Sequence, residues 1–316
     1  MKYTRIAFIS LMAGCSTILV EQFAPAKYAI KEICEITRDP VPDGLSGITY
    51  VGGNRYLSVE DSDGMLHELE IVLGENGEVN RCVTVRSVHL EGRKDVEGCA
   101  YDPLENIVWV ADERDTSITA YSMTGGVAVA SAPVPEVFKT HVRNCSLESL
   151  AITPDGLKLY TANEDTLSVD GERANMEEGG VVRIQEFVRE GRNRPWRASR
   201  QFRYHTEPVE GESYKGRAIS GVSDLVALND GTLFVLEREM SKKNPLFPTC
   251  RAMIFEIDLN EGLSPTKRFL WGDNTMFANY EGMCLGPKLA DGSNALLLIS
   301  DGDKEAVERL MVLSVR

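Results

Sequence analysis

The chain has 316 residues, of which 43% are hydrophobic and 26% are charged, so it can bury a core and is not intrinsically disordered. This length suits two ordinary domains or one all-β barrel or propeller. The formal net charge of −14 argues against nucleic acid as a partner, because an acidic chain repels a phosphate backbone. The same charge suits hard divalent cations, which prefer carboxylate oxygens.

Residues 1–15 have the pattern of an export signal. Lys2 and Arg5 precede a short apolar run at residues 6–14, which is too short to span a bilayer. The small residues before Cys15 are similar to a bacterial lipobox, which predicts that Cys15 is lipidated. A cleaved signal without lipid and an uncleaved anchor are the alternatives. We expect an exported protein, either periplasmic, attached to the outer membrane or extracellular, whose only membrane contact is the lipid.

The number of cysteines is compatible with an exported chain but does not decide whether they form disulfides or remain thiols. Six cysteines follow Cys15, and an even number permits disulfides. Buried free thiols are equally compatible with the sequence. The absence of a CxxC pair argues against a zinc site built on cysteines.

A short apolar pattern that follows a Ser or Glu recurs five times in the remaining chain. Its copies lie at residues 45–50, 96–101, 147–152, 222–227 and 280–285. Turn residues follow each copy and lead into a second strand rich in β-formers, at 56–60, 108–113, 159–164, 233–237 and 296–301. Third strands are predicted at 66–72, 118–122, 181–187, 253–259 and 309–315. Fourth strands are predicted at 83–90, 127–134, 197–204 and 267–270.

The fifth unit has no fourth strand before the chain ends, whereas residues 27–36 read as a strand without a partner. If residues 27–36 pair beside residues 309–315, the repeats close into a ring. Four-stranded repeats in a ring form a β-propeller. We therefore predict a linker at 16–26 and one all-β propeller of five four-stranded blades at 27–316. The wide repeat spacing between Val181 and Gly221 leaves room for a sixth blade.

Acidic residues recur at two positions of each repeat. In every hairpin, the first strand starts and the second strand ends on the same face of the ring, so both positions meet at one mouth of the central channel. Glu97, Glu148 and Glu281 stand at first-strand starts, where the other two units have Ser46 and Ser223. The second-strand ends carry Glu60, Glu113, Glu164, Glu237 and Asp301. Long polar connections at 165–180, 205–220, 238–249 and 271–279 lie on the same face, as functional loops usually do.

Crowded carboxylates repel one another unless some are protonated or a cation lies among them. Ca²⁺ binds about six to eight oxygen ligands in flexible geometry, so we expect a calcium site held by Glu97, Glu148, Glu281 and Asp301. Glu60, Glu113, Glu164 and Glu237 are candidate catalytic acids or bases, or further ligands. The four histidines show no ligand spacing for zinc. The alternative is that the acids cap strands or pair with neighbouring basic residues.

Four basic residues follow second strands on the acidic face. Arg114, Arg238, Lys242 and Lys243 are candidates for binding an anionic substrate, and a salt bridge to an adjacent acid is the alternative for each. The sequence starting at Asp61 resembles the first residues of a calcium loop but lacks the Glu at its twelfth position, which predicts a simple turn. The chain has no GxSxG elbow, Walker loop or dinucleotide fingerprint.

These motifs resemble the bacterial phytase-like family, described as "esterase-like activity of phytase". The resemblance runs from about residue 43 to the C-terminus and is strongest at 148–156, at 221–225 with 233–238, and at 280–287 with 296–301. Residues 95–115 are also similar to the SdiA-regulated propeller proteins. The resemblance implies a propeller, a calcium-lined mouth and hydrolysis of phosphate or other esters. True β-propeller phytases carry richer acidic and basic motifs, so phytate itself is not implied.

Two functions remain open from the sequence. The first is an exported, calcium-dependent hydrolase that acts on a small anionic ester at the acidic mouth. The second is a non-catalytic, calcium-stabilised propeller that binds a ligand or partner at the cell surface. A propeller hosts many functions, so the fold does not choose between them. We expect a monomer in either case.

Overall fold

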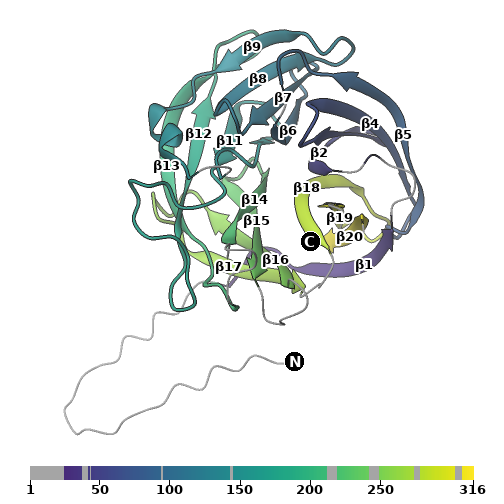
Figure 1. Ribbon diagram of the computed structural model, residues 1–316. Coiled ribbons are helices and arrows are strands. Elements are labelled where there is room, and N and C mark those ends of the chain that lie inside the picture. Colours follow the sequence, from purple (N-terminus) through teal and green to yellow (C-terminus); the bar gives the residue numbers. More distant parts are fainter. Residues whose placement is uncertain are drawn as a thin grey trace, which may run out of the picture.

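A computed structural model describes residues 25–37, 42, 44–93, 95–142, 145–211, 219–241, 249–273, 278–302 and 308–316. In these residues, twenty strands form five four-stranded antiparallel sheets arranged in a ring (Figure 1). The only helix in the described ranges is a short 3₁₀ turn, η1 (Glu136–Thr140). The prediction of an all-β propeller with five blades is therefore confirmed, and no sixth sheet is found in the described part of the chain.

Each blade runs from an inner strand at the axis to an outer strand at the perimeter. Blade 1 consists of β2 (Leu45–Gly52), β3 (Arg55–Glu60), β4 (Met65–Leu73) and β5 (Val79–His89), and blade 2 of β6 (Val96–Asp102), β7 (Ile107–Asp112), β8 (Ser117–Ser122) and β9 (Ala128–Ala132). Blade 3 consists of β10 (Ala151–Ile152), β11 (Lys158–Ala162), β12 (Val181–Val188) and β13 (Arg197–His205), and blade 4 of β14 (Ile219–Ala227), β15 (Thr232–Ser241), β16 (Thr249–Asp258) and β17 (Lys267–Asp273). Blade 5 consists of β18 (Asn279–Lys288), β19 (Asn294–Asp301), β20 (Arg309–Val315) and β1 (Ile30–Thr37).

The ring closes as the sequence predicts. β1 pairs antiparallel with β20, from Ile30 opposite Val315 to Thr37 opposite Arg309. The backbone N–H of Ala29 donates to the carbonyl of Arg316 at 2.9 Å and extends this ladder by one residue. The last blade thus contains strands from both ends of the propeller, which ties the ring together.

Packing between adjacent blades forms the core. Middle strands are covered on both faces, so they read as continuous apolar runs rather than as alternating ones. Leu296, Leu297, Leu298 and Ile299 of β19 are all fully buried, for example. The outer strand β5 has mostly half-buried and exposed residues instead. The inner strands β2, β6, β10, β14 and β18 each contact the inner strands of both neighbouring blades, which makes the centre rigid.

Glycine makes a narrow waist in the central channel. A side chain at Gly98 would place its Cβ 2.6 Å from the backbone of Ser149 in the next blade, and Gly47 and Gly282 meet the next inner strand in the same way. Blade 4 has Asp224 at the matching position. Its carboxylate is buried and accepts the backbone N–H groups of Met283 at 2.7 Å and Leu225 at 2.8 Å. Backbone contacts and one carboxylate therefore close the ring at this level.

A buried ion pair joins blades 2 and 3 at the periphery of the core. Arg189, which follows β12, donates to Asp102 of β6 at 2.7 Å, and both side chains are almost completely buried. The Trp109 indole N–H donates to the same carboxylate at 3.2 Å. The Arg189 guanidinium also lies 4.4 Å from the Trp196 ring centroid, which favours a cation–π contact.

No disulfide joins the six cysteines in the described ranges, although their even number permits pairing. Four of them, Cys99, Cys145, Cys250 and Cys284, are buried. Among the described helices, none is long and apolar enough to cross a membrane.

Candidate functional site

Acidic side chains from four blades converge at the mouth of the channel where the inner strands begin. We define the acidic mouth as the eight carboxylates Asp61, Asp95, Glu97, Glu113, Glu148, Glu164, Glu281 and Asp301. Seven of them raise the pKa of at least one other carboxylate in the set, and the pKa of the eighth, Glu148, is raised by Glu97, Glu164 and Glu113. One cation, Arg238, lies among them.

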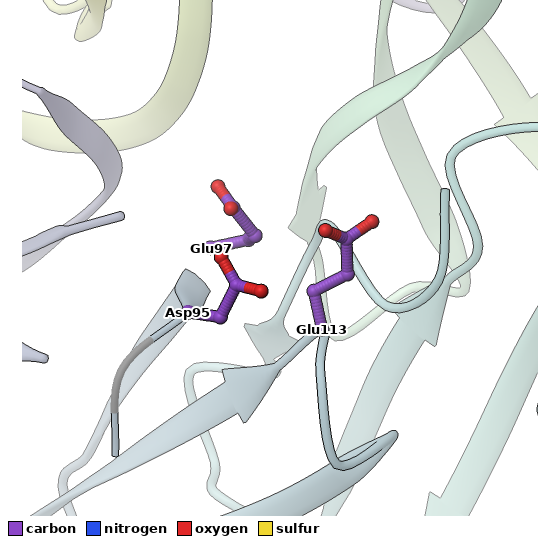
Figure 2. Close-up of side chains that lie close together, drawn as sticks. All are labelled: Asp95, Glu97 and Glu113. Carbon is purple, nitrogen blue, oxygen red and sulfur yellow. The ribbon is translucent and has the colours of Figure 1, made fainter. Parts of the chain in front are cut away.

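Blade 2 supplies the first close group, Asp95, Glu97 and Glu113 (Figure 2). One oxygen from each carboxylate lies within 4.8 Å of the other two. Asp95 and Glu97 are two residues apart at the start of β6, so extended backbone directs both to the same side. Glu113 directly follows β7, and its backbone N–H donates to the Asp95 carbonyl at 2.8 Å. The hairpin register therefore brings the three carboxylates together.

A second group links blades 2 and 3. Oxygens of Glu113, Glu148 and Glu164 also lie within 4.8 Å of one another. The pairing of Leu147 with Asn163 places Glu148 beside Glu164, at the start of the inner strand and just beyond the end of β11. Glu113 belongs to both groups, which makes it the central carboxylate of the mouth.

Arg238 neutralises the opposite side of the mouth. It lies on β15 in blade 4 and forms ion pairs with Glu164 from blade 3 and Glu281 from blade 5. It also donates to the Asn279 side chain at 3.1 Å. Its side chain is only 12% exposed, so these contacts occupy most of the guanidinium. Among the described residues, the blade 2 side of the mouth holds three carboxylates against one exposed cation, Arg114, and so keeps a surplus of negative charge.

Burial and mutual repulsion raise the pKa values of the mouth carboxyls. Burial, reinforced by Glu281, raises the pKa of Glu97 well above 4.5, and burial with Glu97 does the same for the pKa of Glu148. Burial raises the pKa of Glu113 to about 7, although the N–H of Ser146 lowers it. Burial raises the pKa of Glu281 to about 8 despite Arg238. Without a cation, the mouth therefore holds protons near neutral pH.

The family profile described as "Esterase-like activity of phytase" matches residues 42–304, which is most of the chain. The chain belongs to the phytase-like family. Family membership and the five-bladed structure both agree with the resemblance seen in the sequence. No curated protein matches the chain.

This phytase-like protein is similar to several solved structures at low sequence identity. An endo-arabinase from Bacteroides thetaiotaomicron has a TM-score of 0.50 at 9% identity, covering 86% of this chain and 93% of its own. A PQQ-bound aldose sugar dehydrogenase from Streptomyces coelicolor has a TM-score of 0.46 at 13% identity, covering 92% and 99%. A periplasmic gluconolactonase from Pseudomonas aeruginosa has a TM-score of 0.40 at 13% identity, covering 83% of each chain. At these identities, the likeness concerns the fold alone.

The structure of the phytase-like chain places six of the eight predicted acids in the mouth. These are Glu97, Glu113, Glu148, Glu164, Glu281 and Asp301. Glu60 points instead toward the neighbouring strand β4, where its carboxylate lies 2.9 Å from Nε2 of His67. It approaches the mouth only through its chain neighbour Asp61, whose pKa it raises.

Glu237 lies away from the mouth, which corrects its predicted position. The sequence suggested that the second strand of blade 4 ends at Glu237, but β15 continues to Ser241. Side chains alternate along a strand, so Arg238 points to the mouth and Glu237 to the opposite face. There the Glu237 carboxylate is buried and accepts from Tyr204 and, at 2.7 Å, from Lys267.

The predicted substrate-binding residues have different surroundings. Arg238 is held in ion pairs, which was the alternative for each of the four basic residues. Arg114 lies at the rim, 60% exposed, and its Nε forms an ion pair with Asp95 at 3.6 Å, so the same alternative applies to it. Lys242, Lys243 and the lipidation candidate Cys15 lie outside the described residues.

Two residues of the acidic mouth, Asp61 and Asp95, were not among the site residues predicted from the sequence. Asp95 stands two residues before Glu97, and the two-residue period of a strand could have revealed that it shares the same side. Asp61 follows β3 in the segment that we predicted to be a simple turn. Burial, with Asp301 and Glu60, raises its pKa to about 6.

The donor set of the blade 2 side fits Ca²⁺. Two oxygens bound to one Ca²⁺ at about 2.4 Å cannot be more than about 4.8 Å apart. Both groups of carboxylates meet this limit, with three oxygens each. All donors are hard oxygens, and neither group includes His or Cys, which zinc prefers. The residues present therefore suit calcium better than zinc.

Proposed function

We propose that the chain is an exported, calcium-dependent hydrolase of phosphate or other esters that acts at the acidic mouth. The observation that carries this proposal is the convergence of eight carboxylates around one engaged cation, in a chain of the phytase-like family. Surplus negative charge in a partly buried site is costly unless protons or a cation balance it.

Asp95, Glu97 and Glu113, whose oxygens meet the 4.8 Å limit, would hold the calcium ion, and Glu148 adjoins this group through Glu113. They form the surplus negative side of the mouth, whereas Glu281 and Glu164 already share Arg238. This choice shifts the centre of the predicted site from the whole ring toward blades 2 and 3. When bound, Ca²⁺ supplies positive charge that polarises a phosphoryl or acyl oxygen of the substrate.

The protein groups would contribute binding. With calcium bound, Glu113 would be an ionised ligand, because a neighbouring cation favours the charged form of a carboxyl. In chelator its pKa is raised to about 7, so it can hold a proton near neutral pH. Arg114 is exposed at the rim and can pair with the negative charge of a small anionic ester. Arg238 would fix the positions of Glu164 and Glu281 rather than contact the substrate.

The proposed function also includes export of the chain from the cytoplasm. The pattern at residues 1–15 and the lipobox-like residues before Cys15 support a periplasmic, outer-membrane-attached or extracellular protein. Its membrane contact would be the lipid on Cys15, and its net charge of −14 argues against nucleic acid as a partner. Lipidation would be detected as incorporation of labelled fatty acid that a Cys15→Ser variant loses. Equal labelling of both proteins would contradict it.

The alternative is a non-catalytic propeller in which calcium stiffens a binding surface. Burial favours this alternative, because Glu97 is only 9% exposed and Arg238 is already occupied. An ion surrounded by buried carboxylates suits a structural role as well as a catalytic one.

A substrate screen separates the two functions. Phosphomonoesters, phosphodiesters and short acyl esters would be tested with calcium and with chelator, on wild type, Glu97→Gln and Glu148→Gln. A Glu190→Gln variant is the matched control, because Glu190 is 73% exposed and pairs with Arg197 outside the mouth. The hydrolase predicts calcium-dependent turnover that only the two mouth variants lose. Folded, calcium-bound protein that turns over none of these esters would favour the binding module.

A further inference from the structure

The channel has a second end with the opposite chemistry. A cavity of about 370 Å³ opens where the inner strands end, on the face away from the acidic mouth. All five inner strands contribute to its wall, through residues such as Ile48, Ala100, Ile152, Val226 and Leu285. None of its lining residues carries a charge, although 26% of the chain is charged. A cavity of this size lies within the range of small-molecule sites.

The waist separates this cavity from the acidic mouth. Inner strands meet backbone to backbone at Gly47, Gly98 and Gly282, and the Asp224 carboxylate bridges β14 to β18 at the same level. A ligand that enters from the far face reaches the cavity without passing this level. It would not contact the carboxylates of the mouth.

The polar groups of the cavity favour a neutral ligand. Tyr50 donates its hydroxyl to the Gly53 carbonyl at 3.2 Å, and Tyr101 donates to Asn106 at 3.1 Å, so each ring is anchored by its own turn. Thr49 Oγ1 accepts the Tyr101 N–H at 3.0 Å. The inner strands are the last strands of their sheets, so their axial edges add only uncharged N–H and C=O groups. An anionic ligand would lose its hydration here without gaining a counter-charge.

We propose that this cavity is a separate binding site for a small, uncharged, mainly apolar ring compound. Its apolar wall and the flat faces of Tyr50, Tyr101, Pro103 and Pro154 suit such a ring. The proposal does not rest on calcium or on hydrolysis at the mouth.

A pair of related fluorescent probes tests this inference. N-phenyl-1-naphthylamine is neutral, and 1-anilinonaphthalene-8-sulfonate is its sulfonated, anionic counterpart. Both would be titrated against the folded protein. The neutral probe is expected to bind at one site per chain, at least about tenfold more tightly than the anion, because burying an unpaired charge is costly. Equal affinity for both probes, or no binding of the neutral probe, would overturn the proposal.

Substitutions in the cavity wall test whether the probe binds in the cavity. Val51→Trp and Ile152→Trp add bulk at two half-buried lining positions, so one informative variant remains if the other fails to fold. Each variant is expected to bind the neutral probe about tenfold more weakly or worse, since the added indole ring occupies the space that the probe would fill. Val85→Trp, at a valine that is 59% exposed outside the cavity, is the control. Unchanged probe affinity in a folded lining variant would contradict a site in this cavity, and so would an equal loss of affinity in Val85→Trp. Glu97→Gln changes the acidic mouth at the other end of the channel and should leave probe affinity unchanged.

Discussion

Glu113→Gln tests the electrostatics of the mouth most sharply. Burial raises the pKa of Glu113 to about 7, so folded protein binds this proton more tightly than unfolded protein does. The associated stability is fully present below pH 4.5 and is lost as pH rises through about 7. Glutamine has no charge to desolvate, and its side-chain oxygen can still accept the Ser146 N–H that Glu113 accepts at 2.9 Å.

The shift from 4.5 to about 7 corresponds to roughly 3 kcal/mol at pH 8 and to less than about 1 kcal/mol at pH 5. In chelator, Glu113→Gln should therefore melt about 4–5 °C above wild type at pH 8 and close to wild type at pH 5. With calcium the order should reverse at pH 8, because the variant lacks one carboxylate ligand. Glu190→Gln, which changes an exposed carboxylate, should match wild type throughout.

Melting curves recorded at both pH values, in chelator and in calcium, provide the assay. If Glu113→Gln were no more stable than wild type at pH 8 in chelator, burial would not raise the pKa of Glu113 as described. An identical calcium-induced rise in melting temperature for both proteins would show that Glu113 does not hold the ion.

Three further changes have defined outcomes. Arg189→Met leaves its buried carboxylate partner unpaired and should cost about 3–5 kcal/mol in urea unfolding, whereas a loss under about 1 kcal/mol would contradict the role of this ion pair. Gly98→Ala places a methyl group against the backbone of the next inner strand and should cost about 1–3 kcal/mol, while Gly125→Ala, where only side-chain atoms lie near, should cost less. Arg238→Met removes positive charge from the mouth, so calorimetry should show tighter calcium binding; weaker binding would count against a cluster with surplus charge.

Most of the architecture could be predicted because the five-fold sequence repeat marks the strands and turns of each blade. The recurring apolar pattern, with its turns of Gly, Asn and Asp, indicates where each hairpin starts and reverses. The unpartnered strand near residue 30 predicted closure beside β20, and Ile30 indeed pairs with Val315. Acids at hairpin ends such as Glu97 and Glu113 could be assigned to one face, because hairpin direction alone decides it.

The remaining site details depend on strand length and on contacts between blades. Glu237 was misplaced because β15 runs four residues past it, and alternation then exposes Arg238 to the mouth instead. The pairing of Arg238 with Glu164 and Glu281 joins residues from three blades, which no local pattern reveals. Asp224 occupies a position of the repeat that carries no functional pattern in the sequence, yet its carboxylate bridges β14 to β18 by accepting the Met283 N–H.

Calcium binding by calorimetry tests the central claim most directly. Chelator-treated wild type would be titrated with Ca²⁺ at pH 7.5–8, at which about half or more of Glu113 side chains are ionised even before calcium binds. Glu97→Gln and the control Glu190→Gln would be titrated in parallel. The acidic mouth predicts saturable binding of calcium to wild type and to the control, and strongly weakened binding to Glu97→Gln. Absence of binding to folded wild type, or equal binding to all three proteins, would contradict a calcium site at this mouth.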